Sequence, residues 1–122
     1  MTEEASPKMP RMKDVPRDME PYFIAFLRRG ERWNDTHGTE AADLLPRHLA
    51  FQREQVEAGR YVLTGPITDD GPLVGILIIA AKTAEEALAI ATGDPGVQSG
   101  RLAVEVRPVL LPSLKELKIN YP

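Results

Sequence analysis

The sequence predicts one domain of the α+β class, with elements in the order β-α-β-β-α-β of the ferredoxin-like arrangement. Residues 61–64 and 73–79 are rich in β-branched and apolar residues, and the turn sequence at 69–72 separates them, so they form a hairpin. Segments with helical signals, 43–58 and 83–92, flank this hairpin. The sequence therefore predicts a four-stranded antiparallel sheet with both helices on one face.

The 122 residues are enough for one domain with its own core. Residues 1–20 mix methionines, prolines and charges without an apolar period, so we expect a flexible N-terminal arm. The domain itself spans 21–109, and 110–122 form a C-terminal tail rich in leucine, lysine and proline. The pattern of this tail does not decide whether it docks on a partner.

Composition excludes several classes of function. The chain has no cysteine, so disulfides and thiolate chemistry are absent. A formal net charge of −3 without a basic stripe argues against a nucleic-acid partner. No apolar run is long enough to serve as a signal sequence or a membrane span, which predicts a soluble cytoplasmic protein.

The first strand is predicted at 22–27, where apolar residues occupy both faces before Arg28-Arg29-Gly30 stops it. A polar segment with a single tryptophan, Trp33, follows. Trp33 either covers a pocket or packs on the edge of the domain, and the pattern leaves both open.

The first helix is predicted to begin with Asp43 as its N-cap, which places Pro46 in the first turn, where a missing N–H is tolerated. Gly59 follows its end as the C′ residue. On a helical wheel, His48 falls inside the apolar arc. We therefore expect His48 to face the sheet. The central stripe of this arc consists of Leu45, Leu49 and Val56.

The second helix begins with the capping-box sequence Thr83-Ala84-Glu85-Glu86 and ends at Gly93. A turn at 94–96 leads to the last strand, in which Leu102, Val104 and Val106 share one apolar face and which Pro108 ends. Because the helices cover only one face of the sheet, the apolar strand 73–79 needs a second cover. We infer a homodimer in which two sheets pack face to face.

Several motifs occur in an order that resembles the YciI-like (YCII-related) family of small dimeric α+β barrel proteins. The residues that carry the likeness are Phe26-Leu27-Arg28-Arg29-Gly30, His48, Ala58 to Pro66, Asp70-Gly71, Gly75, Asp94-Pro95 and Ser99-Gly100-Arg101. The resemblance implies the ferredoxin-like fold, a dimeric barrel and a site built on a histidine and an aspartate, which match His48 and Asp94. It also implies small-molecule chemistry, because some relatives are lyases that remove halide from hydroxylated aromatics.

A histidine whose tautomer is fixed by a carboxylate is a suitable general base or acid near neutral pH. The alternative for His48 is a core histidine with one hydrogen bond. Asp94 has a rival role too, because Gly-Asp-Pro after a helix is ordinary turn chemistry.

Substrate-binding candidates accompany this pair. Arg28 and Arg29 at a strand end could hold a carboxylate or phenolate with their guanidinium groups, or they could be solvated surface charges. Trp33, Gly65 and Pro66 could shape a pocket wall, although a turn explains the last two equally well.

No metal or cofactor is expected. Asp69-Asp70 is better explained as a turn than as a metal site. The spacing of His37 and His48 fits no helical metal pair, and no phosphate-binding loop occurs. Two hypotheses follow from the sequence. The first is a cofactor-free lyase, isomerase or cyclase acting on an aromatic or cyclic acidic small molecule, and the second is a non-catalytic dimeric module that binds a small ligand.

Overall fold

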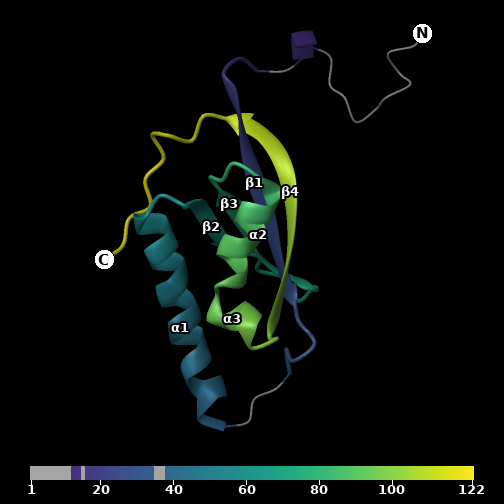
Figure 1. Ribbon diagram of the computed structural model, residues 1–122, viewed down its shortest axis with the longest axis vertical. Helices are drawn as coiled ribbons and strands as arrows, with labels where there is room; N and C mark the ends of the chain where they lie inside the picture. The colour runs from purple at the N-terminus through teal and green to yellow at the C-terminus, as the bar shows by residue number, and fades with distance from the viewer. Residues whose placement is uncertain (1–11, 15, 35–37) are drawn as a thin grey trace, which may run out of the picture.

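The structure is a computed structural model that describes residues 12–14, 16–34 and 38–122. His37 and most of the expected N-terminal arm lie outside these residues. The chain forms a sheet with helices laid against it (Figure 1). Its elements are η2 (Met12–Asp14, a 3-10 turn), β1 (Met19–Arg29), α1 (Gly38–Glu57), β2 (Tyr61–Pro66), β3 (Leu73–Ile79), α2 (Ala84–Thr92), α3 (Pro95–Gln98) and β4 (Leu102–Pro112).

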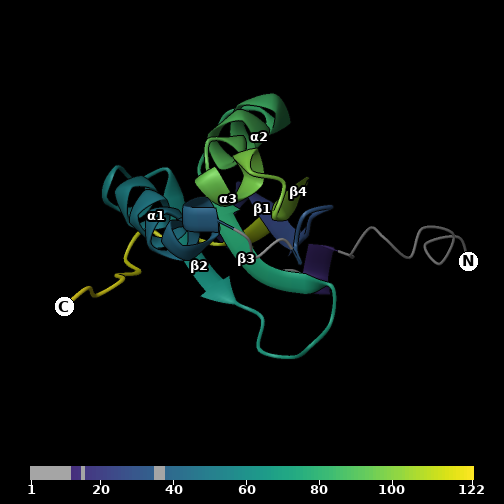
Figure 2. The same ribbon diagram turned by 90° about the horizontal axis from the view of Figure 1, so that it is seen from below.

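The four strands form one antiparallel sheet in the order β2-β3-β1-β4. This order confirms the ferredoxin-like prediction, because β1 and β3 lie in the centre and the hairpin strand β2 lies at one edge. Seen from below, α1, α2 and α3 all lie on the same side of the sheet (Figure 2). The opposite side carries no helix in the part of the chain that the structure describes.

The core lies between the sheet and the helices. Ala25 of β1, Leu77 and Ile79 of β3 and Tyr61 of β2 are almost fully buried. The side chains that meet them from α2 are small: Ala87 and Ala91 of that helix are both 0% exposed. Small side chains allow α2 to lie close to the sheet. The short helix α3 follows α2 and contacts both α1 and β4.

Strands β1 and β4 are both longer than the sequence predicts. β1 begins at Met19 rather than Tyr22, and β4 continues past Pro108 to Pro112. Pro108 lies opposite Phe23 within the ladder. The expectation that proline would end this strand was wrong because β4 is an edge strand, where a missing N–H can face away from the ladder.

The start of α1 also differs from the prediction. The helix begins at Gly38, so Asp43 is not its N-cap and Pro46 lies inside the helix rather than in the first turn. A proline inside a helix leaves one carbonyl without its i+4 donor. Ala42 and Pro46 are exposed, so water can take the place of the missing donor.

The face that α1 buries is rotated from the predicted stripe. Leu45 and Leu49 are 63% and 52% exposed, whereas Leu44 is 8% exposed and Gln55 is 4% exposed. His48 is half-buried. The expectation that His48 faces inward therefore holds, but Leu45 and Leu49 lie at the margin of the contact rather than at its centre.

Two of the predicted cap signals are confirmed, namely the C′ glycine of α1 and the capping box of α2. Gly59 has φ +80°, and the N–H of Arg60 donates to the carbonyl of Gln55, which closes α1 as a Schellman motif. At α2, the Thr83 hydroxyl accepts the Glu86 N–H at 3.0 Å, while the Glu86 carboxylate accepts the Lys82 N–H at 2.7 Å. The capping box thus forms, with its return bond one residue earlier than usual.

The C-terminal residues run back beside the start of β1 and the end of α1 (Figure 1). The N–H of Leu114 donates to the Tyr22 hydroxyl at 2.9 Å, and Lys115 pairs with Glu20 at 3.2 Å. The guanidinium of Arg53 lies 4.5 Å from the ring centroid of Tyr121. The tail therefore contacts its own chain at both ends of its course.

Candidate active site

His48 and Asp94 form the most buried charge contact of the described residues. Nδ1 of His48 lies 2.6 Å from Oδ2 of Asp94, and the two side chains are 16% and 2% exposed. The other carboxylate oxygen of Asp94 accepts the Gly96 N–H at 2.8 Å. Each oxygen of this buried carboxylate thus has a partner, as the cost of burying a charge requires.

Local structure explains the position of Asp94. The expected turn at 94–96 is the N-terminus of the short helix α3, and Asp94 is its N-cap with an extended backbone. Pro95 takes the first helical position, where proline is favoured. The turn role and the histidine contact therefore occur together: one oxygen caps the helix, which leaves the second oxygen directed at α1.

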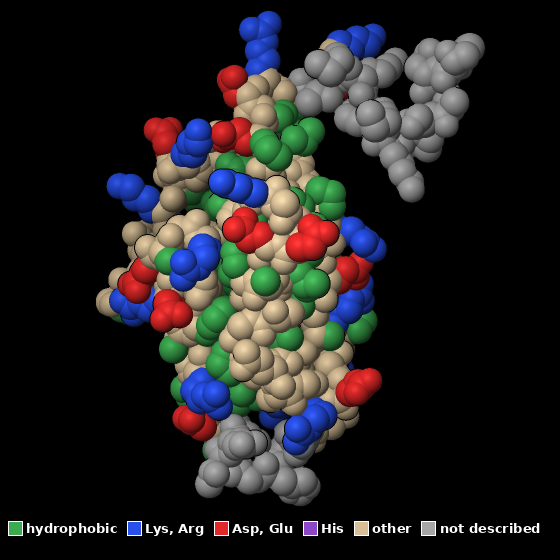
Figure 3. Space-filling model, viewed as in Figure 1, with side chains coloured by type: hydrophobic (Ala, Val, Ile, Leu, Met, Phe, Trp, Pro, Cys, Tyr) green, Lys and Arg blue, Asp and Glu red, His purple; other side chains and the backbone are tan. Residues whose placement is uncertain are grey.

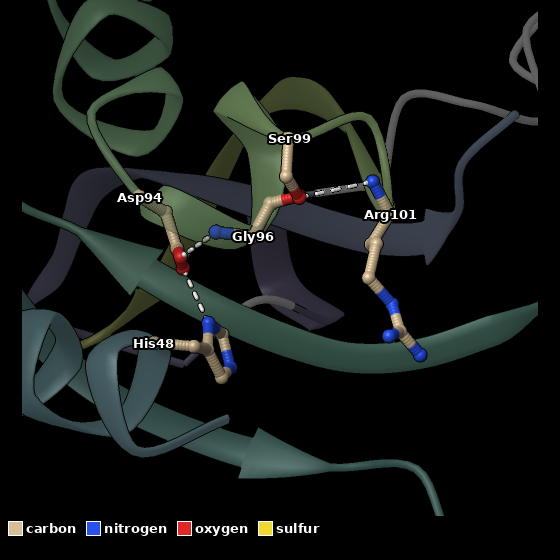
Figure 4. Close-up of polar contacts among 5 residues, drawn as sticks. All are labelled: His48, Asp94, Gly96, Ser99 and Arg101. Atoms are coloured by element: carbon tan, nitrogen blue, oxygen red, sulfur yellow. Dashed lines mark hydrogen bonds and ion pairs between the residues drawn. The ribbon is translucent and has the colours of Figure 1, made fainter. Parts of the chain in front are cut away.

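The contact with Asp94 also determines the histidine tautomer. An ionised carboxylate can only accept hydrogen bonds, so Nδ1 of His48 is the donor to Asp94. In the neutral imidazole the other nitrogen, Nε2, then carries a lone pair. In Figure 4 the second ring nitrogen lies on the side of the ring away from Asp94. The pair can accept a proton at Nε2 and return it.

A cavity of about 490 Å³ lies between α1, the hairpin strands and the start of β4, and His48 lines it. This volume is in the range of small-molecule sites. Polar groups among its described lining are few, namely His48, Gln52, Thr64 and Arg101. Most of the remaining wall is aliphatic, with side chains from Leu27, Leu44, Leu45, Leu49, Val74 and Leu102.

Three of the predicted binding residues line this cavity: Trp33, Gly65 and Pro66. Trp33 also packs against the core, so its two alternative roles are compatible. The predicted arginines are placed differently. Arg28 binds Glu105 through Nε and Nη2 at 3.3 and 3.1 Å, and neither Arg28 nor Arg29 is among the described residues that line the cavity.

Arg29 instead contacts the hairpin and the indole ring. Its Nη2 donates to the carbonyl of Asp70 at 2.9 Å, and its guanidinium lies 5.3 Å from the ring centroid of Trp33. Arg28 projects from the opposite face of β1, because alternate residues of a strand point to opposite faces. The interpretation of Arg28 as surface charge is the one that fits these contacts.

Gln52, Thr64 and Arg101 line the cavity, but the sequence pattern did not predict them as binding residues. Gln52 stands one helical turn after His48, so the i,i+4 rule could have identified it. Arg101 reaches the cavity only because the loop before β4 folds against the loop after β1. No local signal indicates that contact.

Tyr61 is 1% exposed, and its phenol lies close enough to Asp94 for an electrostatic interaction with that carboxylate. Burial, and to a smaller extent this charge, raises the pKa of the Tyr61 phenol well above the usual range. The hydroxyl has no hydrogen-bond partner among the described residues. Tyr61 therefore remains a neutral phenol in the folded protein.

In the described part of the chain, no group of three or more His, Cys, Asp or Glu side chains is placed to hold a metal ion. None of the helices described is long and apolar enough to cross a membrane. On the face shown in Figure 3, acidic and basic side chains are interspersed rather than gathered into one patch.

These features define a class: a ferredoxin-like α+β domain that carries a buried histidine–aspartate pair at an apolar cavity. The chain belongs to the family of YCII-related domains, whose model matches residues 25–111. The match runs from β1 to β4 and includes both His48 and Asp94.

No curated protein matches the chain. One similar solved structure is the 5-chloro-2-hydroxyhydroquinone dehydrochlorinase from Burkholderia phenoliruptrix AC1100, in complex with 2,5-dihydroxybenzoquinone. It is 22% identical, with a TM-score of 0.49, and the alignment covers 70% of this chain and 90% of that one.

Proposed function

We propose that this protein is an enzyme that moves a proton on a small aromatic or cyclic acidic substrate, with His48 as the base and acid and Asp94 as its positioning partner. The observation that carries the proposal is the 2.6 Å contact between Nδ1 of His48 and Oδ2 of Asp94 at the wall of a cavity. Neither group requires a cofactor for this chemistry.

The proposed step begins at Nε2 of His48, which takes a proton from a carbon of the bound substrate. The electron pair of the broken C–H bond forms a new double bond. In an elimination, the leaving group departs with its own bonding electrons, and the imidazolium later releases the proton to water. In an isomerisation, the imidazolium returns the proton to a different carbon.

Asp94 would contribute in two ways. It holds the imidazole in the tautomer that leaves Nε2 unprotonated, and its negative charge stabilises the imidazolium that forms. Because Asp94 is 1% exposed and bonded to Gly96, its position does not depend on the substrate. Gln52 and Thr64 offer hydrogen bonds to polar groups of the substrate from the two sides of the cavity.

Proton exchange tests the proposal without knowledge of the full reaction. The protein would be incubated in D₂O with a panel of hydroxylated aromatics and cyclic acids, and deuterium incorporation or halide release would be followed by NMR and ion chromatography. We expect exchange at one carbon with the wild type, and its loss in His48→Gln, which keeps a polar side chain of similar length. Exchange that persists in His48→Gln would remove His48 from the mechanism.

The competing function is a non-catalytic ligand-binding module. The composition of the cavity wall favours this function, because ionisable groups are few. Its described residues offer one imidazole and one guanidinium, and aliphatic side chains form most of the rest. A compound that raises the melting temperature of the protein, yet is recovered without deuterium and chemically unchanged, would support this function over the enzyme.

We also propose that the protein is a homodimer formed through the sheet face opposite the helices. Ile24 and Phe26 of β1 point to this face, as do Ile76 of β3 and Leu63 of β2, because they are register partners or alternate with core residues. All four are only partly buried in the single chain. Light scattering should give a dimer mass that Phe26→Asp reduces to the monomer. A monomeric wild type at micromolar concentration would contradict the proposal.

A further inference from the structure

We propose that Arg101, held against Trp33, is the residue that binds the carboxylate or phenolate of the substrate and so makes the cavity specific for anionic aromatic molecules. This inference rests on the proposed function only in assuming that the cavity holds a small ligand. It assigns the anion-binding role to Arg101 in place of Arg28 and Arg29.

The placement of charge around the cavity is the first support. Among the described lining residues, Arg101 is the only Lys or Arg. Its guanidinium lies 5.8 Å from the ring centroid of Trp33, and Trp33 lines the same cavity. In Figure 4, Arg101 reaches down from the loop before β4 and His48 from α1, on two sides of one space.

The second support is the way in which two loops hold this arginine. The Gly30 N–H donates to the Arg101 carbonyl at 2.8 Å, and the Arg32 N–H donates to the Gly100 carbonyl at 2.9 Å. A Cβ atom at Gly30 would lie 2.2 Å from the Gly100 oxygen, so only glycine permits this approach. The backbone thus fixes Trp33 and Arg101 relative to each other before any ligand binds.

The guanidinium groups of Arg29 and Arg101 both lie near the ring of Trp33, but the two arginines have different surroundings. Arg29 is turned toward the hairpin by its bond to the Asp70 carbonyl and does not line the cavity. Arg101 lines the cavity. The aliphatic side chains around the cavity lower the local polarity, which strengthens the attraction between a guanidinium and an anion. An aromatic ring beside the indole would place its acidic group at Arg101 and its remaining edge toward His48.

The single tryptophan of the chain gives a direct assay, because Trp33 fluorescence reports on this cavity. Benzoate and benzamide serve as probes, since they share shape but differ in charge. We expect the wild type to bind benzoate more tightly than benzamide. Arg101→Gln should remove this preference by weakening benzoate binding about tenfold or more, as the loss of a charge-assisted hydrogen bond predicts. Arg101→Lys, which keeps charge but not the planar fork, should retain part of it.

Arg29→Gln is the matched control, because it removes the other guanidinium from the same indole ring. It should change the intrinsic fluorescence and leave the benzoate preference intact. Equal binding of benzoate and benzamide by the wild type, no benzoate binding at all, or equal losses in Arg29→Gln and Arg101→Gln would each overturn the proposal. Thermal melts would identify any variant that fails to fold, and for an unfolded Arg101→Gln the Arg101→Lys variant decides.

The outcome is separable from the fate of the proposed enzyme. Benzoate carries no transferable C–H proton in this scheme, so its binding does not require chemistry. If the benzoate preference depends on Arg101 while proton exchange ignores His48, the anion site stands and the catalytic proposal fails. If exchange depends on His48 while Arg101→Gln leaves the benzoate preference unchanged, the catalytic proposal stands and this inference fails.

Discussion

Nδ1 of His48 lies 2.6 Å from Oδ2 of Asp94, although the two residues are 46 positions apart in the sequence. One comes from a long helix and the other caps a short one, so the contact joins two elements that lie against the same face of the sheet. The second Asp94 oxygen accepts the Gly96 N–H, which fixes the orientation of the carboxylate relative to His48. The effect of replacing Asp94 by its isostere Asn can therefore be predicted.

Asp94→Asn is expected to reverse the histidine tautomer. The Gly96 N–H still requires an acceptor, so the carbonyl oxygen of the new side-chain amide takes that position and its NH₂ group faces His48. Nδ1 must then accept, and the proton moves to Nε2, where it blocks the base. ¹⁵N NMR of the imidazole should show the change, and turnover on any substrate found should fall about 10²–10⁴-fold. An unchanged tautomer would contradict this account of the pair.

Gly30→Ala should destabilise the protein and disturb the contact between the two loops that carry Trp33 and Arg101. The new Cβ would lie 2.2 Å from the Gly100 oxygen, which is backbone and cannot rotate away. We expect a loss of about 1–3 kcal/mol in the free energy of unfolding, as for overpacked sites, together with a shift in Trp33 fluorescence. Chemical denaturation measures the first and emission spectra the second.

Gly65→Ala is the control for that substitution. Its added Cβ would meet only Ile76 Cγ1 at 3.9 Å, an ordinary contact. Its stability should therefore stay close to that of the wild type. If both variants lost the same stability, close approach of the two loops would not be the cause.

Tyr61→Phe should leave stability at neutral pH unchanged or raise it. The hydroxyl is buried without a partner among the described residues, so its removal frees the fold from an unmet hydrogen bond. Urea denaturation of both proteins would measure the difference. A loss of more than about 1 kcal/mol would indicate that the hydroxyl has a partner, such as a bound water.

The same residue predicts a loss of stability at alkaline pH. Burial raises the pKa of the folded phenol, so the unfolded chain releases its proton near the ordinary value of 10.0 while the folded chain retains it. Rising pH therefore favours unfolding above that value. Tyr61→Phe should reduce this loss, which melts at a series of alkaline pH values would show.

Acid should release the C-terminal tail from β1. Hydrogen bonds from Ser113 and Lys115 hold the pKa of Glu20 below its ordinary value of 4.5. Because the pKa of Glu20 is lower when the tail is docked, ionised Glu20 stabilises the docked tail at pH values above 4.5. This stabilisation is lost as the pH falls through the lowered pKa of the folded state. The protection factor of the Leu114 amide, which compares its exchange rate with that of an unfolded chain at the same pH, should fall under these conditions. Glu20→Gln should show the lower protection factor already at neutral pH.

Signals that act over a few residues predicted local structure well. The capping box at Thr83 and the C′ glycine at Gly59 formed as expected, because each depends on hydrogen bonds within one turn of helix. The strand patterns likewise predicted the hairpin of β2 and β3. The order of these elements was sufficient for the ferredoxin-like fold, since few arrangements connect them without crossing.

Errors arose where neighbouring elements decide the outcome. Pro108 does not end β4, because the strand lies at an edge of the sheet. Leu45 and Leu49 have the right spacing for a core stripe, yet the orientation of α1 leaves them half-exposed beside the cavity. A helical period specifies which residues share a face, but not which face the rest of the molecule covers.

The sequence by itself determined the four strands and the two longer helices, their order, and the presence of a histidine on an inward helical face. Family resemblance, rather than spacing, paired that histidine with Asp94. Only the tertiary structure joined the two side chains, moved Arg28 to a partner on the far face and brought Arg101 beside Trp33. These contacts link residues far apart in the chain, and their geometry depends on how helices and loops pack on the sheet, which no local pattern encodes.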